Sequence, residues 1–341
     1  MKIFVYEYIT SGGPLEDGVN QPFPRSLLRE GHAMLEALAR DFAAIDGIEV
    51  TVMVDARIES DISFGNRQWI KSSADHHLWF DRLAGDAEKT VVIAPEFDGI
   101  LYDRTCRVVA CRGTLLGPSP DIVELTSDKH RTSQHLAAAG IPIVPGRRLS
   151  VGDRLPADAA YPAVLKRLDG AGSLDVVRID DAGQAGRFGE LPHAARLEPY
   201  LPGLAASVSV LCGPQQRIAL IPCCQRLSQD GRFQYAGGHT LQDEEVADRA
   251  RRLAQAAVET LESPLGYVGV DLLLGDTAAD DIVLEINPRL TTSYVGLRAA
   301  YPQNLADAML QVADGRRIAL PEVVRSIEFD ADGAVRFAPD A

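Results

Sequence analysis

Apolar stretches of two kinds alternate along the first hundred residues. Residues 2–8, 49–54 and 90–95 are rich in β-branched and aromatic side chains, a composition typical of buried strands. Residues 25–45 instead repeat apolar side chains at helical spacing, which predicts an amphipathic helix. This alternation predicts a parallel sheet covered by helices, with ligands bound beyond the carboxyl ends of its strands.

A different pattern begins near Gly117. Two prolines directly after it end one element, and Ser127 or Asp128 can cap the helix that follows. Residues 161–178 then run strand, glycine-rich turn and strand, which predicts a β-hairpin. We therefore expect a domain boundary at this point.

The rest of the chain is rich in strands. Helices are expected near 243–261 and 296–314. Together with the first two patterns, this predicts an α/β protein with α+β lobes. Its predicted parts are an N-terminal Rossmann-like domain over residues 1–116, a small lobe over 117–195 and a large lobe over 196–341.

Composition and charge narrow the function. Hydrophobic residues make up 46% of the chain and charged residues 24%, and the formal net charge is −14. The negative charge disfavours binding to nucleic acid or to an anionic membrane surface. No apolar run approaches the roughly 18 residues of a membrane span, and the N-terminus is predicted to be a strand and not a signal peptide. The five cysteines show no paired metal spacing, so we expect reduced thiols and a cytoplasmic protein.

Three polar side chains interrupt apolar strands in the large lobe. Asp271 lies within Gly-Val-Asp-Leu-Leu-Leu, where a buried carboxylate is costly unless it is paired or bound to a metal. Glu285 and Asn287 are two residues apart, so they share one face of a strand. If a turn joins the two strands, three oxygen ligands meet, a set that suits Mg²⁺ and disfavours zinc. A solvent-facing hairpin rim without a metal is the alternative.

The string Glu285-Ile-Asn-Pro-Arg289, preceded by Gly-Val-Asp271, resembles the metal-binding end of ATP-grasp enzymes. Members of this family carry one lysine at the start of the middle segment and another on a strand before a glycine-rich loop. Lys129 and Lys166 match these two positions. The loop after the second lysine contains Gly170, Gly172 and Ser173. The resemblance implies that these residues bind the phosphates of ATP.

The family also places an adenine-binding hinge between its two lobes. By resemblance, that hinge is formed by Glu198, Pro199, Tyr200 and Leu201. Many family members have an acidic residue shortly after the hinge that holds the ribose. This chain has Ala205 in that region and no acid, so its ribose contact departs from the family pattern.

The resemblance implies an ADP-forming ligase that uses ATP and Mg²⁺, with Mn²⁺ as an alternative metal. A substrate carboxylate attacks the γ-phosphate to give an acyl phosphate, and an amine then displaces phosphate. The metal on Asp271, Glu285 and Asn287 would bridge phosphates, while Lys166 and Arg289 would be catalytic. The family also implies small-molecule substrates and a homodimer.

Candidates for the substrate pocket come from four separate segments. They are Ser11, Gly12, Arg226, Tyr235, Gly237, Gly238 and Thr292. The glycine pair after the first strand lets backbone approach a ligand, and an ordinary turn is an equal alternative. For Arg226, expected just after a strand, carboxylate binding and a salt bridge are equal alternatives. Tyr235 and its neighbouring glycines are expected in the loop that follows.

Within the family, the opening Tyr6-Glu-Tyr-Ile-Thr-Ser-Gly-Gly13 and the Tyr-x-Gly-Gly segment resemble the branch that contains tyramine–glutamate ligase of methanofuran biosynthesis. That resemblance implies glutamate as the activated acid and tyramine or a tyrosine-like amine as the acceptor. One alternative is another ATP-grasp enzyme: a D-alanine-type dipeptide ligase, an amino-acid ligase or a biotin-carboxylase-like enzyme. A nucleotide-binding module without turnover is the other.

Overall fold

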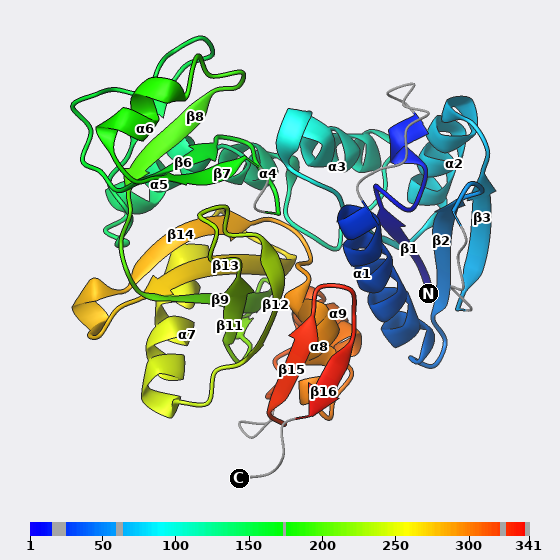
Figure 1. Cartoon of the computed structure of the whole chain (residues 1–341). Coiled ribbons are helices and arrows are strands. Elements are labelled where there is room, and N and C mark those ends of the chain that lie inside the picture. Colours follow the sequence, from blue (N-terminus) through cyan, green and yellow to red (C-terminus); the bar gives the residue numbers. More distant parts are fainter. Residues whose placement is uncertain (16–24, 59–63, 173–174, 321–324, 338–341) are drawn as a thin grey trace.

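Three β-sheets organise the chain in the computed structural model (Figure 1). The structure describes residues 1–15, 25–58, 64–172, 175–320 and 325–337. The N-terminal sheet is parallel, as predicted. No helix in these ranges is long and apolar enough to cross a membrane.

The N-terminal domain is a parallel sheet with the strand order β3-β2-β1-β4. Its elements are β1 (Lys2–Glu7), α1 (Arg25–Ala43), β2 (Glu49–Asp55), β3 (Asn66–Ile70), α2 (Ser73–Asp86), β4 (Lys89–Ile93) and α3 (Ile100–Ala110). The central strand β1 is buried on both faces, as parallel strands covered by helices usually are. Glu7 pairs with Ile93, so the carboxyl ends of β1 and β4 lie side by side.

The small lobe contains an antiparallel sheet with the order β5-β8-β6-β7. Its elements are β5 (Arg147–Leu149), β6 (Ala163–Arg167), β7 (Val176–Ile179), α6 (Ala182–Arg187) and β8 (Ala195–Pro199). The predicted hairpin is the β6–β7 pair. The sheet continues to Pro199, so the predicted lobe boundary at residue 195 falls inside β8.

Two helices connect the N-terminal domain to the small lobe. They are α4 (Pro120–Thr126) and α5 (Lys129–Ala138). The carboxylate of Asp128 accepts hydrogen bonds from the backbone N–H groups of His130 and Arg131, so Asp128 caps α5, as predicted. The cap places Lys129 in the first turn of this helix, where its side chain reaches the large lobe.

The large lobe is an antiparallel sheet with the order β14-β13-β9-β11-β12-β15-β16, with β10 paired to β9. Its strands are β9 (Leu204–Cys212), β10 (Arg217–Ala219), β11 (Cys223–Leu227), β12 (Tyr235–Thr240), β13 (Gly266–Leu274), β14 (Ile282–Asn287), β15 (Ile327–Asp330) and β16 (Val335–Phe337). Helix α7 (Glu244–Glu259) packs its buried alanines against β9 and β13, near its predicted position.

Several details differ from the sequence prediction. The helix expected over 296–314 is two helices, α8 (Ser293–Ala300) and α9 (Leu305–Ala313), because Pro302 between them cannot donate a helical hydrogen bond. Arg226 lies inside β11 and not after it. Tyr235 begins β12, so the Tyr-x-Gly-Gly segment is a strand and not a loop.

Helix α1 fixes the N-terminal domain against the large lobe. Its Asp41 accepts hydrogen bonds from the Tyr294 hydroxyl (2.6 Å) and from Arg298 Nε (2.9 Å), both on α8. Leu38 and Phe42 also share one buried apolar core with residues of α8 and α9. In Figure 1, α1 stands beside α8 and α9.

Candidate active site in the central cleft

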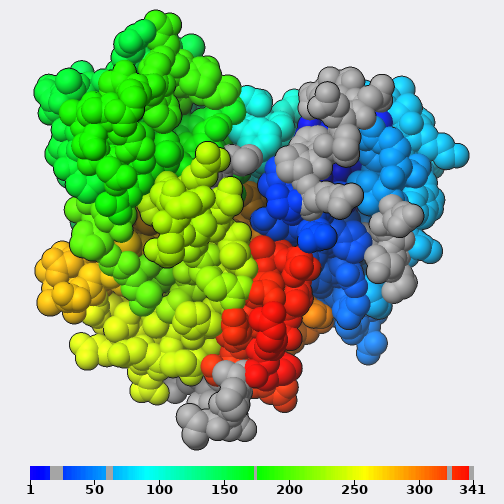
Figure 2. All heavy atoms as spheres, viewed as in Figure 1, coloured from blue at the N-terminus to red at the C-terminus, as the bar shows by residue number. Residues whose placement is uncertain are grey.

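A cleft of about 1140 Å³ lies where the three parts of the chain meet. Figure 2 shows the small lobe in green, the large lobe in yellow to red and the N-terminal domain in blue around the middle of this face. Residues of all three parts line the cleft. Its volume is large enough for a nucleotide and a second small molecule.

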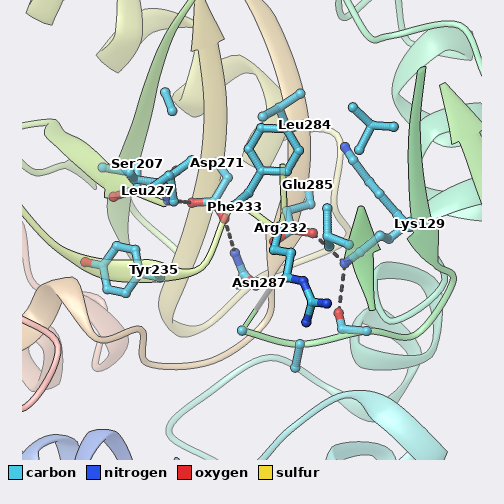
Figure 3. Close-up of a pocket in the computed structure, with 18 of the residues that line it drawn as sticks. Lys129, Ser207, Leu227, Arg232, Phe233, Tyr235, Asp271, Leu284, Glu285 and Asn287 are labelled. Carbon is cyan, nitrogen blue, oxygen red and sulfur yellow. Dashed lines mark hydrogen bonds and ion pairs between the residues drawn. The ribbon is translucent and has the colours of Figure 1, made fainter. Parts of the chain in front are cut away.

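The three predicted metal ligands lie together on the floor of this cleft (Figure 3). Asp271 on β13 pairs directly with Glu285 on β14. Asn287 lies two residues after Glu285 on β14, so both side chains are on the same face of the sheet. Asn287 Nδ2 donates to Asp271 Oδ2 at 3.2 Å, and Gln225 Nε2 donates to Asp271 Oδ1 at 2.9 Å. The register of the two strands therefore brings the three predicted metal ligands together, and Gln225 of β11 lies next to them.

The charges at this point are unequally balanced. Lys129 Nζ lies 2.5 Å from Glu285 Oε2. Burial would raise the pKa of Glu285, but attraction to Lys129 outweighs burial and lowers that pKa to about 2. Burial and the neighbouring charge of Glu285 raise the pKa of Asp271 well above its usual range. Two facing carboxyl groups with one shared lysine are therefore left with an excess of negative charge when both are ionised.

That excess fits a bound divalent cation. In the described ranges, no group of three or more His, Cys, Asp and Glu side chains is arranged to hold a metal. Asp271 and Glu285 supply two carboxylates and Asn287 an amide oxygen, which is the hard-ligand type that Mg²⁺ prefers. A set this small suits Mg²⁺ in particular, because that ion is commonly shared between one or two protein carboxylates and nucleotide phosphates.

A second lysine is held by a buried network in the small lobe. Lys166 Nζ lies 2.7 Å from Glu198 Oε2, and Arg196 Nε donates to Glu198 Oε1 at 2.6 Å. Arg196 is almost fully buried, and its other nitrogens contact His130, Ser133 and Val144. Glu198 therefore orients Lys166 toward the cleft, and Arg196 ties this part of β8 to α5.

The glycine-rich loop after β6 also reaches the cleft. Gly170 and Gly172 both line it, and Lys129 Nζ donates to the Gly170 carbonyl at 2.9 Å. Gly172 has a φ of +61°, which glycine adopts without strain. Ser173 lies outside the described residues.

The predicted hinge segment forms another wall of the cleft. Pro199, Tyr200 and Leu201 all line it. The Tyr200 backbone N–H donates to the Pro162 carbonyl at 2.8 Å, and the Tyr200 ring stacks on Phe233 at a centroid distance of 6.3 Å. Phe233 belongs to the turn between β11 and β12, so this turn of the large lobe touches the hinge.

Apolar side chains also line the cleft. They are Val144 from the loop before β5, Val164 from β6 and Leu284 from β14. In the stretch where many family members carry a ribose-binding acid, Ala205 and Ser207 line the cleft instead. The hydroxyl of Ser207 is thus the polar side chain that this chain offers there (Figure 3).

Arg289 is anchored by a residue that the sequence did not suggest. Its Nε and Nη2 donate to the two carboxylate oxygens of Glu96, at 2.8 and 3.1 Å. Both side chains are largely buried, with 12% and 6% exposed. Glu96 follows β4, so this bidentate pair joins the N-terminal domain to the segment directly after the metal ligands.

The predicted substrate residues divide into two groups. Tyr235 and Thr292 line the cleft, but Ser11, Gly12, Arg226, Gly237 and Gly238 are not among its lining residues. Ser11 is fully buried and donates to the Met53 carbonyl at 2.9 Å. Arg226 forms ion pairs with Glu328 and Asp330 of β15, so the salt-bridge alternative describes it. The two glycines pair with β15, where a side chain would collide with backbone.

The cleft and its supporting network include residues that the sequence reasoning missed. These are Glu7, Glu30, Glu96, Arg196 and Gln225. Glu7 and Glu96 lie at, or just beyond, the carboxyl ends of β1 and β4, where open parallel sheets bind ligands. That rule, applied to the predicted strands, would have identified both. The other three carry no local pattern, because their positions depend on tertiary packing.

Comparison with known proteins agrees with this arrangement. Residues 126–293 match the ATP-grasp domain, and residues 48–123 match the pre ATP-grasp 3 domain. The two matches together extend over most of the chain. The chain belongs to the ATP-grasp superfamily. The family recognised from the sequence is therefore confirmed.

Relatives of this ATP-grasp protein include two archaeal enzymes of the same name. Tyramine–L-glutamate ligase from Methanocaldococcus jannaschii is 22% identical over 324 residues, which cover 93% of this chain and 90% of that enzyme. Tyramine–L-glutamate ligase from Methanocaldococcus fervens is 23% identical over 324 residues, with 93% and 95% covered.

Solved structures confirm the predicted ATP-grasp fold. An ATP-grasp superfamily protein from Archaeoglobus fulgidus superposes with a TM-score of 0.72 at 23% identity, covering 96% of this chain and 91% of its own. An L-amino acid ligase from Bacillus licheniformis superposes with a TM-score of 0.66 at 14% identity, covering 96% and 78%.

Proposed function

We propose that this ATP-grasp protein is an ADP-forming ligase that joins glutamate to tyramine or a similar arylalkyl amine. The family and the relatives support the general reaction, the joining of a carboxylate to an amine. The observation that carries the proposal is the convergence of Asp271, Glu285, Asn287 and Lys129 in one cleft.

ATP is proposed to lie between the two lobes. The adenine would rest on Val164 and Leu284 beside the hinge, and the ribose hydroxyls would be near Ser207. The phosphates would then extend under Gly170 toward Lys129 and Lys166. The cleft lining supports this placement, because Val164, Leu284, Ser207 and the two lysines all line the same cavity.

Asp271, Glu285 and Asn287 are the residues proposed to hold Mg²⁺. When bound, the ion would offset the negative charge of the phosphates, which is the main requirement of phosphoryl transfer. Lys129 already lies 2.5 Å from Glu285, so nucleotide binding would exchange part of this ion pair for contacts to phosphate.

In the proposed reaction, a carboxylate oxygen of glutamate attacks the γ-phosphorus of ATP and ADP leaves. After its ammonium form has released one proton to solvent, the amine attacks the acyl carbon through the nitrogen lone pair. Inorganic phosphate then leaves with the carboxylate oxygen that bridged carbon and phosphorus, and the nitrogen loses a second proton to give the neutral amide. Arg289 is proposed to stabilise the charge on the transferred phosphoryl group, since a guanidinium suits planar oxyanions. Glu96 would hold Arg289 in place through their bidentate contact.

The assay that tests this proposal offers MgATP with pairs of amino acids and amines and measures ADP release. Glutamate with tyramine should release ADP well above the rate with either substrate alone. If this pair gives no ADP while another pair turns over, the choice of substrates is wrong. If no carboxylate–amine pair turns over, the ligase assignment itself fails.

A further inference from the structure

One face of helix α1 is turned toward the cleft, at the end opposite the hinge. Leu27, Glu30, Gly31 and Met34 of this helix all line the cleft. Their spacing of three and four residues places them on a single helical face. A Cβ atom at Gly31 would lie 2.7 Å from the Glu7 carboxylate, so glycine allows α1 to approach β1 closely. This face therefore forms a wall of the cleft, and Glu30 is its charged residue.

Three carboxylates lie near Arg289, and two of them are already engaged. Glu96 binds the guanidinium through both oxygens. Glu7 is buried and accepts hydrogen bonds from the Thr10 hydroxyl at 2.7 Å and from the Thr10 backbone N–H at 2.8 Å. Glu30 is different, because it lines the cleft but forms no ion pair with any lysine or arginine in the described ranges.

Glu30 is thus a carboxylate without a cation in a partly buried position. Burial raises its pKa to about 6, although the nearby Arg289 and Thr292 act in the opposite direction. Arg289 is bound through both carboxylate oxygens of Glu96, so within the described ranges Glu30 has no ion-pair partner of its own. A positively charged group from a ligand would supply that partner.

The surroundings of Glu30 indicate what else that ligand carries. Leu27 and Met34 flank Glu30 on the same helical face, and Tyr235 lies across the cleft. Burial raises the pKa of Tyr235, and the charges of Asp271 and Glu30, which line the same cleft, act in the same direction. A ligand with an ammonium group on an apolar or aromatic body fits this wall better than a small, fully polar amino acid.

We infer that Glu30 binds the ammonium group of an arylalkyl amine substrate and so selects the acceptor of the reaction. This inference rests on the proposed function for the reaction that follows binding, but the binding step can be measured alone. Glu30 is then a specificity-determining residue and takes no part in phosphoryl transfer, which is proposed to occur at the metal ligands and the two lysines.

The first test is equilibrium binding of two matched probes by calorimetry. Tyramine carries the ammonium group, and tyrosol carries a hydroxyl in its place. The wild-type chain should bind tyramine at least about 10-fold more tightly than tyrosol, and Glu30→Gln should reduce this ratio to about 2-fold or less. An unchanged ratio in the variant, or a wild type that does not distinguish the probes, overturns the inference.

The second test follows turnover with the same variant. Glu30→Gln should raise KM for tyramine about 10- to 100-fold and leave KM for ATP and glutamate within about 2-fold. Glutamyl hydroxamate formation should persist, because hydroxylamine is largely uncharged at neutral pH and does not require the carboxylate. A rise in KM for glutamate without a rise in KM for tyramine would show that Glu30 binds glutamate and not the amine, and would overturn the inference.

Glu36→Gln is the matched control on the same helix. Glu36 pairs with Arg40 outside the cleft, so the same change of carboxylate to amide should alter neither binding nor turnover. The two tests also separate the two claims. Loss of the tyramine preference in Glu30→Gln, with no ligation by the wild type, supports the amine site and refutes the proposed reaction. Ligation by the wild type, with the tyramine preference unchanged in Glu30→Gln, supports the proposed reaction and refutes the amine site.

Discussion

The two ends of the cleft are held together by different kinds of contact. At the nucleotide end, Asp271 and Glu285 are direct neighbours in the register of two adjacent strands. At the acceptor end, Glu30 and Glu96 belong to the N-terminal domain, while Arg289 and Thr292 belong to the large lobe. The first arrangement depends on one β-hairpin, and the second depends on how two domains are docked.

This difference has a consequence for specificity. A site within one hairpin keeps its geometry when the surrounding domains change, so activation of a carboxylate by ATP is the invariable part of the chemistry. A site between domains changes with each residue at the interface. We therefore expect substitutions at the nucleotide end to reduce turnover with every substrate pair, and substitutions at the acceptor end to change which amine is used.

The largest expected effect is at the nucleotide end. Glu285→Gln should lower kcat about 100-fold or more with any substrate pair, because a lost carboxylate ligand weakens charge neutralisation of the phosphates. The measurement is steady-state ADP release at saturating MgATP. Asp276→Asn is the control, since Asp276 is an exposed residue beyond the end of β13. Unchanged turnover in Glu285→Gln would refute the metal assignment.

The next largest effect on turnover is expected at the Glu96–Arg289 pair, which joins the N-terminal domain to the segment after the metal ligands. Glu96→Gln removes the charge that holds Arg289, so kcat for ligation should fall about 10-fold. Binding of ATP, measured by calorimetry, should change by less than about 2-fold, because Glu96 is not part of the proposed nucleotide contacts. Glu124→Gln, in an exposed ion pair with Arg131, should have no effect. A larger loss in ATP affinity than in kcat would place Arg289 in nucleotide binding instead.

A smaller effect is expected in the small lobe. Arg196→Lys keeps a positive charge but cannot reproduce the contacts to Glu198, His130 and Ser133 together. With Lys166 less well oriented, KM for ATP should rise about 5-fold, with kcat less affected. Arg147→Lys, at an exposed position on the neighbouring strand β5, serves as the control. An equal change in both variants would indicate a general effect on the lobe.

The smallest effect concerns pH and the acceptor end. Glu30 lines the cleft together with Glu7, Tyr235 and Arg289, and burial raises the pKa of Glu30 to about 6. It carries its negative charge above that pH and loses it below. KM for tyramine should therefore rise about threefold between pH 7 and pH 5.5 in the wild type and stay flat in Glu30→Gln. Parallel profiles in both proteins would exclude Glu30 as the titrating group.

The same contrast explains which parts could be predicted from sequence. Asp271, Glu285 and Asn287 lie close together in the chain, so strand periodicity and the family resemblance were enough to place them on one hairpin. Lys129 and Lys166 were identified by their order relative to that hairpin. Glu30 could not be found this way, because its role depends on α1 docking against α8 and α9.

Some details of the fold were predicted wrongly from the sequence for similar reasons. Helical periodicity continues across Tyr301-Pro302, which concealed the break between α8 and α9. Glycines in Tyr235-Ala-Gly-Gly suggested a loop, yet they allow close contact of β12 with the backbone of β11 and β15. Arg226 was an ambiguous candidate because its partners, Glu328 and Asp330, are about a hundred residues away in the chain.

Transfer of oxygen from the carboxylate substrate to phosphate tests the central claim most directly. The wild-type chain would be incubated with MgATP, tyramine and glutamate labelled with ¹⁸O in its carboxylates, and the phosphate released would be analysed by mass spectrometry. An acyl phosphate intermediate predicts one ¹⁸O atom in each phosphate, in amounts equal to the amide product. Product formation with unlabelled phosphate would contradict activation of the carboxylate by phosphorylation in this cleft.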